Sequence, residues 1–410
     1  MPRLLAVFVC LTTVGLATSA RAQLTPTAPP ATPPFPPLTK TVFPEEPKKA
    51  RTPTETFVLE PAMSIELDDT PSGPAGFDQK TAYVPLGSGR LVAIDLDQAT
   101  LKWSRDIVSN MAPVVAGGLV VVAGDEQLAA FDAATGAERW AVPVSGGFSA
   151  PPLVDSGWVV VVAADGTVLT IRAADGTALW SRAVGVKAAA TPFIAADGVY
   201  LSLEDGRVMK LALLTGEPQW EHKLPGRPGE LLVLDDRIFV GCANKRFYCL
   251  NPKNGKERWH WRVGGRPVGR AAVDEKRVYY VALDNILWAL DRGNGVMKWR
   301  AELPVRASGG PIVIGSVVAV AAMALQINGY RAQTGVAAGT AVLPAADLAG
   351  PPQVLPDAHP LVASVAIVTR EGTFTLLKRQ LEPLPVPLPF PFGDEIPLSV
   401  INAGVPPPSR

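Results

Sequence analysis

The chain has 410 residues, with 38 basic and 38 acidic side chains and a formal net charge of zero. Balanced charge gives no global reason to expect nucleic acid or an anionic membrane surface as partner. The length can hold two or three domains, or one domain built from repeats.

The first 22 residues have the pattern of a secretory signal peptide. Arg3 precedes an apolar stretch over residues 4–16, and Ala20-Arg21-Ala22 offers a small-residue cleavage site. The apolar stretch is too short for a membrane span, and no later run reaches the roughly 18 apolar residues that a span requires. Cys10 lies inside the stretch without the context of a lipidation site. We therefore expect no transmembrane segment and a periplasmic or secreted protein, cleaved near Ala22.

Two proline-rich segments bracket the middle of the chain. Residues 23–55 contain TPTAPPATPPFPPLTK, and residues 381–410 contain LPVPLPFPF. Such sequences favour extended linkers over a packed core. The first is predicted to be a disordered linker. The second is predicted to be a tail that is disordered, docks on the folded domain or engages a partner. The folded domain is expected over residues 56–380.

Tryptophan recurs through this domain at a nearly constant interval. Successive members of the series are 37, 40, 40, 39 and 40 residues apart: Trp103, Trp140, Trp180, Trp220, Trp259 and Trp299. Four positions before each Trp stand, in order, Ala99, Gly136, Gly176, Gly216, Gly255 and Gly295. One period later Gly339 replaces the Trp, although Thr334-Gly335 keeps its place. Such a period is typical of propellers and solenoids. We interpret the Trp and Gly series as structural docking between repeats.

Each repeat also contains a continuous apolar run followed by a turn signal. The runs include LVVVA at 119–123, VVVVA at 159–163 and VYYVA at 278–282, and the turns include Asp165-Gly166 and Asn244-Lys245. Unbroken apolar strands are buried on both faces, and the turn residues favour two-residue hairpins. Four-stranded antiparallel blades around an axis satisfy both conditions. We therefore predict an all-β, eight-bladed propeller, with seven blades as the alternative. FVLE at 57–60 is expected to supply the last outer strand and close the ring.

The motif A-x-D-x-x-T-G-x-x-x-W, as in Ala130 to Trp140, resembles the repeat of quinoprotein-type β-propellers. That group includes pyrroloquinoline-quinone-dependent alcohol dehydrogenases and BamB-like outer-membrane assembly factors. The resemblance implies docking of each Trp between blades. It leaves two functions open: a non-enzymatic scaffold of the cell envelope, and a quinone-dependent oxidoreductase with a degenerate site.

The dehydrogenase alternative implies pyrroloquinoline quinone with calcium, adjacent cysteines and long insertions between blades. The chain has no adjacent cysteines, and its repeats have almost no insertions. Cys242 and Cys249 lack metal-ligand spacing, and no Ser/His/Asp arrangement or phosphate-binding loop points to another enzyme. We therefore expect no catalytic residue, cofactor or metal, and favour the scaffold.

One slot, seven residues after each Trp, differs between repeats. It holds Asn110 and Gly147, then a basic residue in four successive repeats: Lys187, Arg227, Arg266 and Arg306. The slot precedes the innermost strand of the next blade, which places it near the mouth of the channel. We interpret the four residues, hereafter the basic arc, as a binding site for an envelope protein, an acidic peptide or an anionic glycan, presented by a monomer. Solvated loop charges without a partner are the alternative.

The two downstream cysteines leave another choice open. With Asn244-Lys245 as a two-residue turn, Cys242 and Cys249 lie diagonally on one face of a hairpin, near the upper limit of disulfide distance. They form either a disulfide or two buried free thiols.

Overall fold

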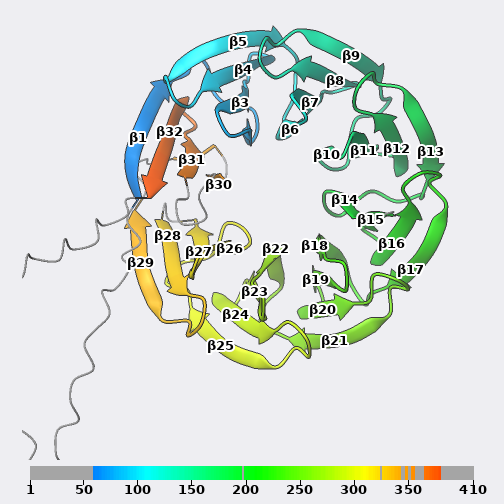
Figure 1. Ribbon diagram of the computed structural model, residues 1–410, viewed down its shortest axis with the longest axis vertical. Coiled ribbons are helices and arrows are strands. Elements are labelled where there is room, and N and C mark those ends of the chain that lie inside the picture. The colour runs from blue at the N-terminus through cyan, green and yellow to red at the C-terminus, as the bar shows by residue number, and fades with distance from the viewer. Residues whose placement is uncertain are drawn as a thin grey trace, which may run out of the picture. The chain divides into compact units, whose positions relative to one another are not determined.

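The computed structural model describes residues 59–195, 198–323, 326–342, 347–349, 352–355 and 364–379. The predicted signal peptide, the linker over 23–55 and the tail over 381–410 lie outside these residues. The described part forms eight separate four-stranded antiparallel sheets. Figure 1 shows them as the blades of a ring, with the first strand of each blade at the centre and the last at the rim. The prediction of an eight-bladed propeller is confirmed, and the seven-bladed alternative is wrong.

The blades are numbered 1 to 8 in chain order, and each contains four strands from the axis outward. The innermost strands are β2 (Gly76–Phe77), β6 (Val114–Ala116), β10 (Leu153–Asp155), β14 (Phe193–Ala195), β18 (Pro228–Val233), β22 (Pro267–Val273), β26 (Ile312–Ile314) and β30 (Gln353–Leu355). The second strands are β3 (Thr81–Pro85), β7 (Leu119–Ala123), β11 (Trp158–Val162), β15 (Gly198–Ser202), β19 (Ile238–Cys242), β23 (Arg277–Ala282), β27 (Val317–Ala322) and β31 (Ser364–Val368).

The third strands are β4 (Arg90–Asp95), β8 (Gln127–Asp132), β12 (Thr167–Arg172), β16 (Arg207–Ala212), β20 (Arg246–Leu250), β24 (Ile286–Asp291), β28 (Gln326–Arg331) and β32 (Thr373–Arg379). The outermost strands are β5 (Thr100–Asp106), β9 (Glu138–Pro143), β13 (Ala178–Ala183), β17 (Pro218–Lys223), β21 (Glu257–Arg262), β25 (Met297–Glu302), β29 (Ala337–Val342) and β1 (Leu59–Glu66).

The continuous apolar runs form the second strands because each of these strands is covered on both faces. In β7, Val120 and Val122 belong to the core shared with blade 1, whereas Val121 and Ala123 belong to the core shared with blade 3. Successive side chains of a strand point to opposite faces, so a sandwiched strand is apolar at consecutive positions and not at alternate ones.

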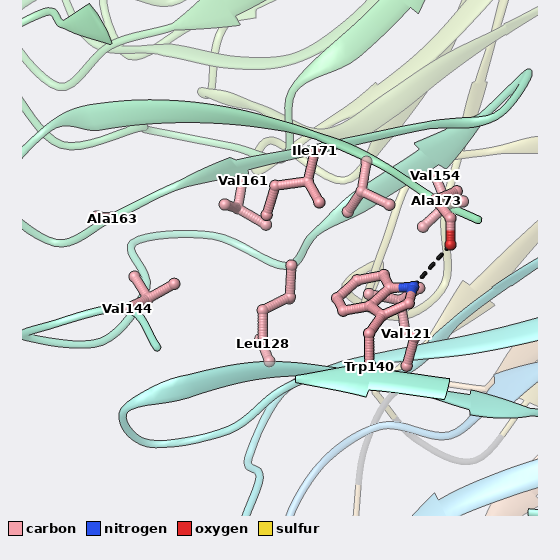
Figure 2. Close-up of a cluster of buried hydrophobic side chains, with 12 residues drawn as sticks. Val121, Leu128, Trp140, Val144, Val154, Val161, Ala163, Ile171 and Ala173 are labelled. Atoms are coloured by element: carbon pink, nitrogen blue, oxygen red, sulfur yellow. Dashed lines mark hydrogen bonds between the residues drawn. The ribbon is translucent and has the colours of Figure 1, made fainter. Parts of the chain in front are cut away.

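The Trp residues pack at the junctions between blades. The indole N–H of Trp140 on β9 donates to the carbonyl of Ala173 in blade 3, over 2.7 Å, and its ring lies among apolar side chains of both blades (Figure 2). The other five members of the series make the same bond to the next blade: Trp103 to Ala133, Trp180 to Leu213, Trp220 to Pro252, Trp259 to Gly293 and Trp299 to Ala332. The three remaining tryptophans lie outside this register; Trp288 is buried, and Trp158 and Trp261 are half-buried.

Blade 8 joins the two ends of the ring. β1 pairs antiparallel with β32, from Leu59 opposite Arg379 to Glu66 opposite Thr373. An N-terminal strand therefore closes the ring as expected, but the bounds from FVLE are wrong. The strand extends to Glu66, and residues 57 and 58 lie outside the described part.

Most of the turns between second and third strands are one residue longer than predicted. In blade 3 the Ala163 N–H donates to the Thr167 carbonyl and Gly166, with φ of +86°, donates back to Ala163. This is a three-residue loop with a left-handed third residue. Blade 5 has the same loop, with Lys245 in the left-handed position.

The longer loop in blade 5 changes the register of the cysteines. Cys249 pairs with Phe239 and Cys242 pairs with Arg246, so the two thiols point to opposite faces of the blade. The expected diagonal placement on one face is wrong, because a shift by one residue moves a side chain to the other face. Both cysteines are buried and free.

Candidate functional site: the basic arc and the axial hollow

The four residues of the basic arc occupy equivalent positions in blades 4 to 7. Each backbone carbonyl accepts a hydrogen bond from the first residue of the turn between the second and third strands of its own blade: Lys187 from Glu204, Arg227 from Ala243, Arg266 from Leu283 and Arg306 from Met323. Thr70, Gly147 and Asp347 make this bond in blades 1, 3 and 8. The slot is therefore a fixed place in the fold, beside the turn and directly before the innermost strand.

Asn110 is the exception to this equivalence. Blade 2 has a two-residue turn in which Gly124 donates to Gln127, and among the described residues the first residue of this turn, Asp125, makes no backbone hydrogen bond to the Asn110 carbonyl. Counting from the Trp assigns Asn110 to the slot, whereas the hydrogen bonds do not.

All four side chains of the basic arc are exposed. Arg227 is the most constrained, because its Nη2 lies 3.3 Å from Oε1 of Glu204 and donates to the Ala189 carbonyl of blade 4 over 3.2 Å. Within the described part of the chain, the other three make no ion pair. Exposed pairs contribute little to stability, on the order of 0–1 kcal/mol, so Glu204 can exchange for another carboxylate.

A hollow of about 400 Å³ lies beside the middle of the arc. Its walls come from the segments that begin the innermost strands of blades 3 to 6 and from residues 241–243 at the end of β19, and they are mostly glycine, alanine and proline. Arg227 and Arg266 contribute the cationic groups, and Glu230 is the one carboxylate among the lining residues. Lys187 and Arg306 do not line the hollow, which divides the arc into an inner pair and two outer members.

Glu230 and Arg270 are polar residues of this region that the sequence patterns did not single out. Arg270 Nε lies 3.7 Å from Oε2 of Glu230, and its guanidinium lies 5.4 Å from the ring centre of Phe193. A local signal exists, since Gly-Arg-Pro occurs at 226–228 and again at 265–267. In both blades the innermost strand begins at this Pro and contains a bulge, which interrupts the ladder next to the hollow.

The lining residues do not fit calcium with a quinone. Calcium is held by six to eight oxygens, mostly from carboxylates and carbonyls. Here the single carboxylate, Glu230, faces a guanidinium, and the two other charged lining residues are arginines. Among the described residues, no group of three His, Cys, Asp or Glu side chains is arranged to hold a metal ion. The same residues contain no helix that is long and apolar enough to cross a membrane.

Comparisons with known proteins agree with this architecture. A family model described as outer membrane protein assembly factor BamB matches residues 56–140, 109–233 and 229–380. The chain is 34% identical to the BamB of Alkalilimnicola ehrlichii over 99 residues. That alignment covers 22% of this chain and 24% of the relative, so it spans about a quarter of the relative's length.

Solved structures with low identity share the fold. BamB from Moraxella catarrhalis is similar at 19% identity and a TM-score of 0.63, over 78% of this chain and all of that one. Quinohemoprotein alcohol dehydrogenase from Comamonas testosteroni is similar at 15% identity and a TM-score of 0.62, over 80% of this chain and 78% of that one. At such identities the likeness concerns the fold alone, which hosts several functions.

Proposed function

Because this chain belongs to the family of the outer membrane protein assembly factor BamB, we propose that it is a non-enzymatic, protein-binding scaffold of the bacterial cell envelope. Its place is the periplasm, at the outer membrane, and its role is in the assembly of outer-membrane proteins. The family match and the relatives named BamB support this assignment.

The observation that carries the binding role is the basic arc itself. Four consecutive blades present an exposed cation at one equivalent position, and two of the four line a hollow. Clustered like charges raise the local potential and steer an oppositely charged partner. The fitting partner is an acidic loop or extended segment of an envelope protein, whose carboxylates replace Glu204 at Arg227 and meet Arg266 in the hollow.

Charge reversal tests this role. The variant Lys187→Glu, Arg227→Glu, Arg266→Glu, Arg306→Glu is compared with the wild type by crosslinking and affinity capture from the cell envelope. Losing four ion pairs and gaining four repulsions should lower affinity for the captured envelope protein by about tenfold or more. Higher salt should weaken the wild-type complex, since exposed charges are screened.

A matched control separates the arc from net charge. Lys253→Glu, Lys256→Glu, Arg258→Glu and Lys276→Glu make the same change at exposed positions of blades 5 and 6 outside the arc. We expect this control to capture partners as the wild type does. If the arc variant folds and captures the same proteins at the same yield, the arc is not the binding site. If the captured species is a glycan, the partner class is wrong.

The absence of quinone chemistry is a separate part of the proposal. Purified protein is mixed with calcium and pyrroloquinoline quinone, and size-exclusion chromatography monitors the cofactor absorbance. We expect no absorbance to elute with the protein. Co-elution would favour the oxidoreductase.

A further inference from the structure

The outermost strands differ in how they protect the edge of their blade. Seven of them carry at least one charged side chain, for example Lys298, Arg300 and Glu302 on β25, and Arg182 on β13. β29 of blade 7, with the sequence AAGTAV, carries none. It is also the strand on which Gly339 stands in place of the repeated Trp.

One edge of β29 has no partner strand in the described part of the chain. Within the described residues it pairs only with β28, from Ala337 opposite Tyr330 to Val342 opposite Gln326, so its other edge is open. Figure 1 places it at the rim, next to β1. Large apolar side chains are exposed at both ends of the strand, with Val336 at 59% and Val342 at 75%.

The whole of blade 7 is poor in charge. Among its described residues only Arg306, in the connection that enters the blade, and Arg331, at the end of β28, are charged. An open edge offers a row of backbone N–H and C=O groups to any strand that can reach them, and proteins block such edges with charged side chains, proline or bulges. β29 contains neither a charged side chain nor proline. The one such device on it is a bulge at Ala338, which leaves the stretch from Gly339 to Val342 in regular pairing with β28.

We propose that the open edge of β29 is a second interaction surface, which takes an extended, uncharged polypeptide segment as a fifth strand of blade 7. Backbone hydrogen bonds supply the attraction, and the lack of charge on β29 selects a segment whose side chains are small or apolar. The exposed Val336 and Val342 add apolar contacts at the two ends.

The length of the strand favours a segment over a second folded copy of this chain. Six residues span about 20 Å. Two convex rims that touch along one such edge would bury far less than the roughly 1,200 Å² of a stable interface between folded proteins. An extended segment needs no larger contact area, because its own backbone groups form hydrogen bonds with those of β29.

The probe is a fluorescein-labelled, uncharged peptide, Ser-Thr-Val-Thr-Val-Thr-Val-Ser amide, and the readout is fluorescence anisotropy with the whole protein. We expect saturable binding to the wild type. The variant Ala337→Lys, Val342→Lys places charges at the two ends of β29 and should weaken binding by roughly tenfold or more. The same peptide with all backbone nitrogens methylated should not bind, since it lacks the donors.

The control variant is Ala178→Lys, Ala183→Lys, which changes the two end residues of β13, also exposed, in blade 3. It should bind the peptide as the wild type does. Equal binding by both variants, binding of the methylated peptide, or no binding to the wild type would each overturn the proposal. So would a wild-type dimer in sedimentation that Ala337→Lys, Val342→Lys abolishes, because the edge would then serve a second copy. None of these outcomes bears on the basic arc.

Discussion

The indole ring of Trp140 in blade 2 lies against Gly176 in blade 3, so closely that a Cβ atom at Gly176 would approach Cδ2 of the ring to 2.9 Å. Glycine is therefore required at position 176 for two reasons. A side chain there would collide with the indole ring, and the backbone is left-handed, with φ of +74°. Within one repeat the Gly and the Trp of the motif stand four residues apart. The Gly that contacts Trp140 belongs to the next repeat and lies 36 residues further along the chain.

Gly176→Ala should destabilise the protein more than Gly185→Ala. The two glycines have nearly the same φ, +74° and +75°, so both substitutions strain the backbone alike. A Cβ at Gly185 meets nothing within 4 Å, whereas at Gly176 it displaces the indole. We expect an additional loss of about 1–3 kcal/mol in the free energy of unfolding, measured by urea denaturation. Equal losses for the two variants would mean that the contact with the ring does not matter.

Trp140→Ala should lower the free energy of unfolding by about 3–5 kcal/mol. The substitution empties a buried site between two blades and leaves the Ala173 carbonyl without the indole N–H. Trp158→Ala serves as the comparison, because Trp158 is half-buried and lies outside the docking series. Calorimetry on both variants should give the larger drop in melting temperature for Trp140→Ala, and the reverse order would contradict the docking role.

The features of the fold that repeat were the ones that could be predicted. The Trp and Gly period, together with the doubly buried second strands, predicted the blades, and eight of them with seven as the alternative. The closing strand was harder to place because β1 pairs with β32, more than 300 residues away, and no local pattern sets that register. At this last junction Met63 takes the place of Trp after the bulge, and Ala99, with φ of +55°, takes the place of Gly.

For the site, the period was sufficient to find the equivalent slot but not its surroundings. The hydrogen bond from Glu204 to Lys187 follows from the repeat, whereas the ion pair of Glu204 with Arg227 joins two blades and depends on how closely they approach. The pairing of Glu230 with Arg270 depends on bulges in two adjacent innermost strands. Turn residues such as Asn-Lys also suit loops of two and three residues, so sequence could not decide the register of blade 5.

Asp132→Asn should reduce the dependence of stability on pH at acid pH. Hydrogen bonds from Arg139, and then from the Thr135 N–H and hydroxyl, lower the pKa of Asp132 from 3.8 to about 2. A carboxyl with a lowered pKa in the folded state stabilises the protein above about pH 4, and this contribution is lost as the pH falls towards about 2. Urea midpoints of wild type and Asp132→Asn should therefore converge on acidification. Midpoints that stay parallel from about pH 6 to about pH 3 would contradict this.

Cys242 and Cys249 should both remain free thiols under oxidising conditions. They belong to different cores, Cys242 with Val240 and Tyr248, and Cys249 with Phe239 and Tyr280. A disulfide would have to pass through the sheet, which its short geometry does not permit. Burial also raises the pKa of Cys249 to about 12, so the folded protein contains almost no reactive thiolate at this position near neutral pH. Alkylation without reductant, followed by peptide mass mapping, should label both residues in urea and neither in buffer. A bridged peptide joining the two cysteines would show that blade 5 has the two-residue turn after all, with the register of β20 shifted by one residue.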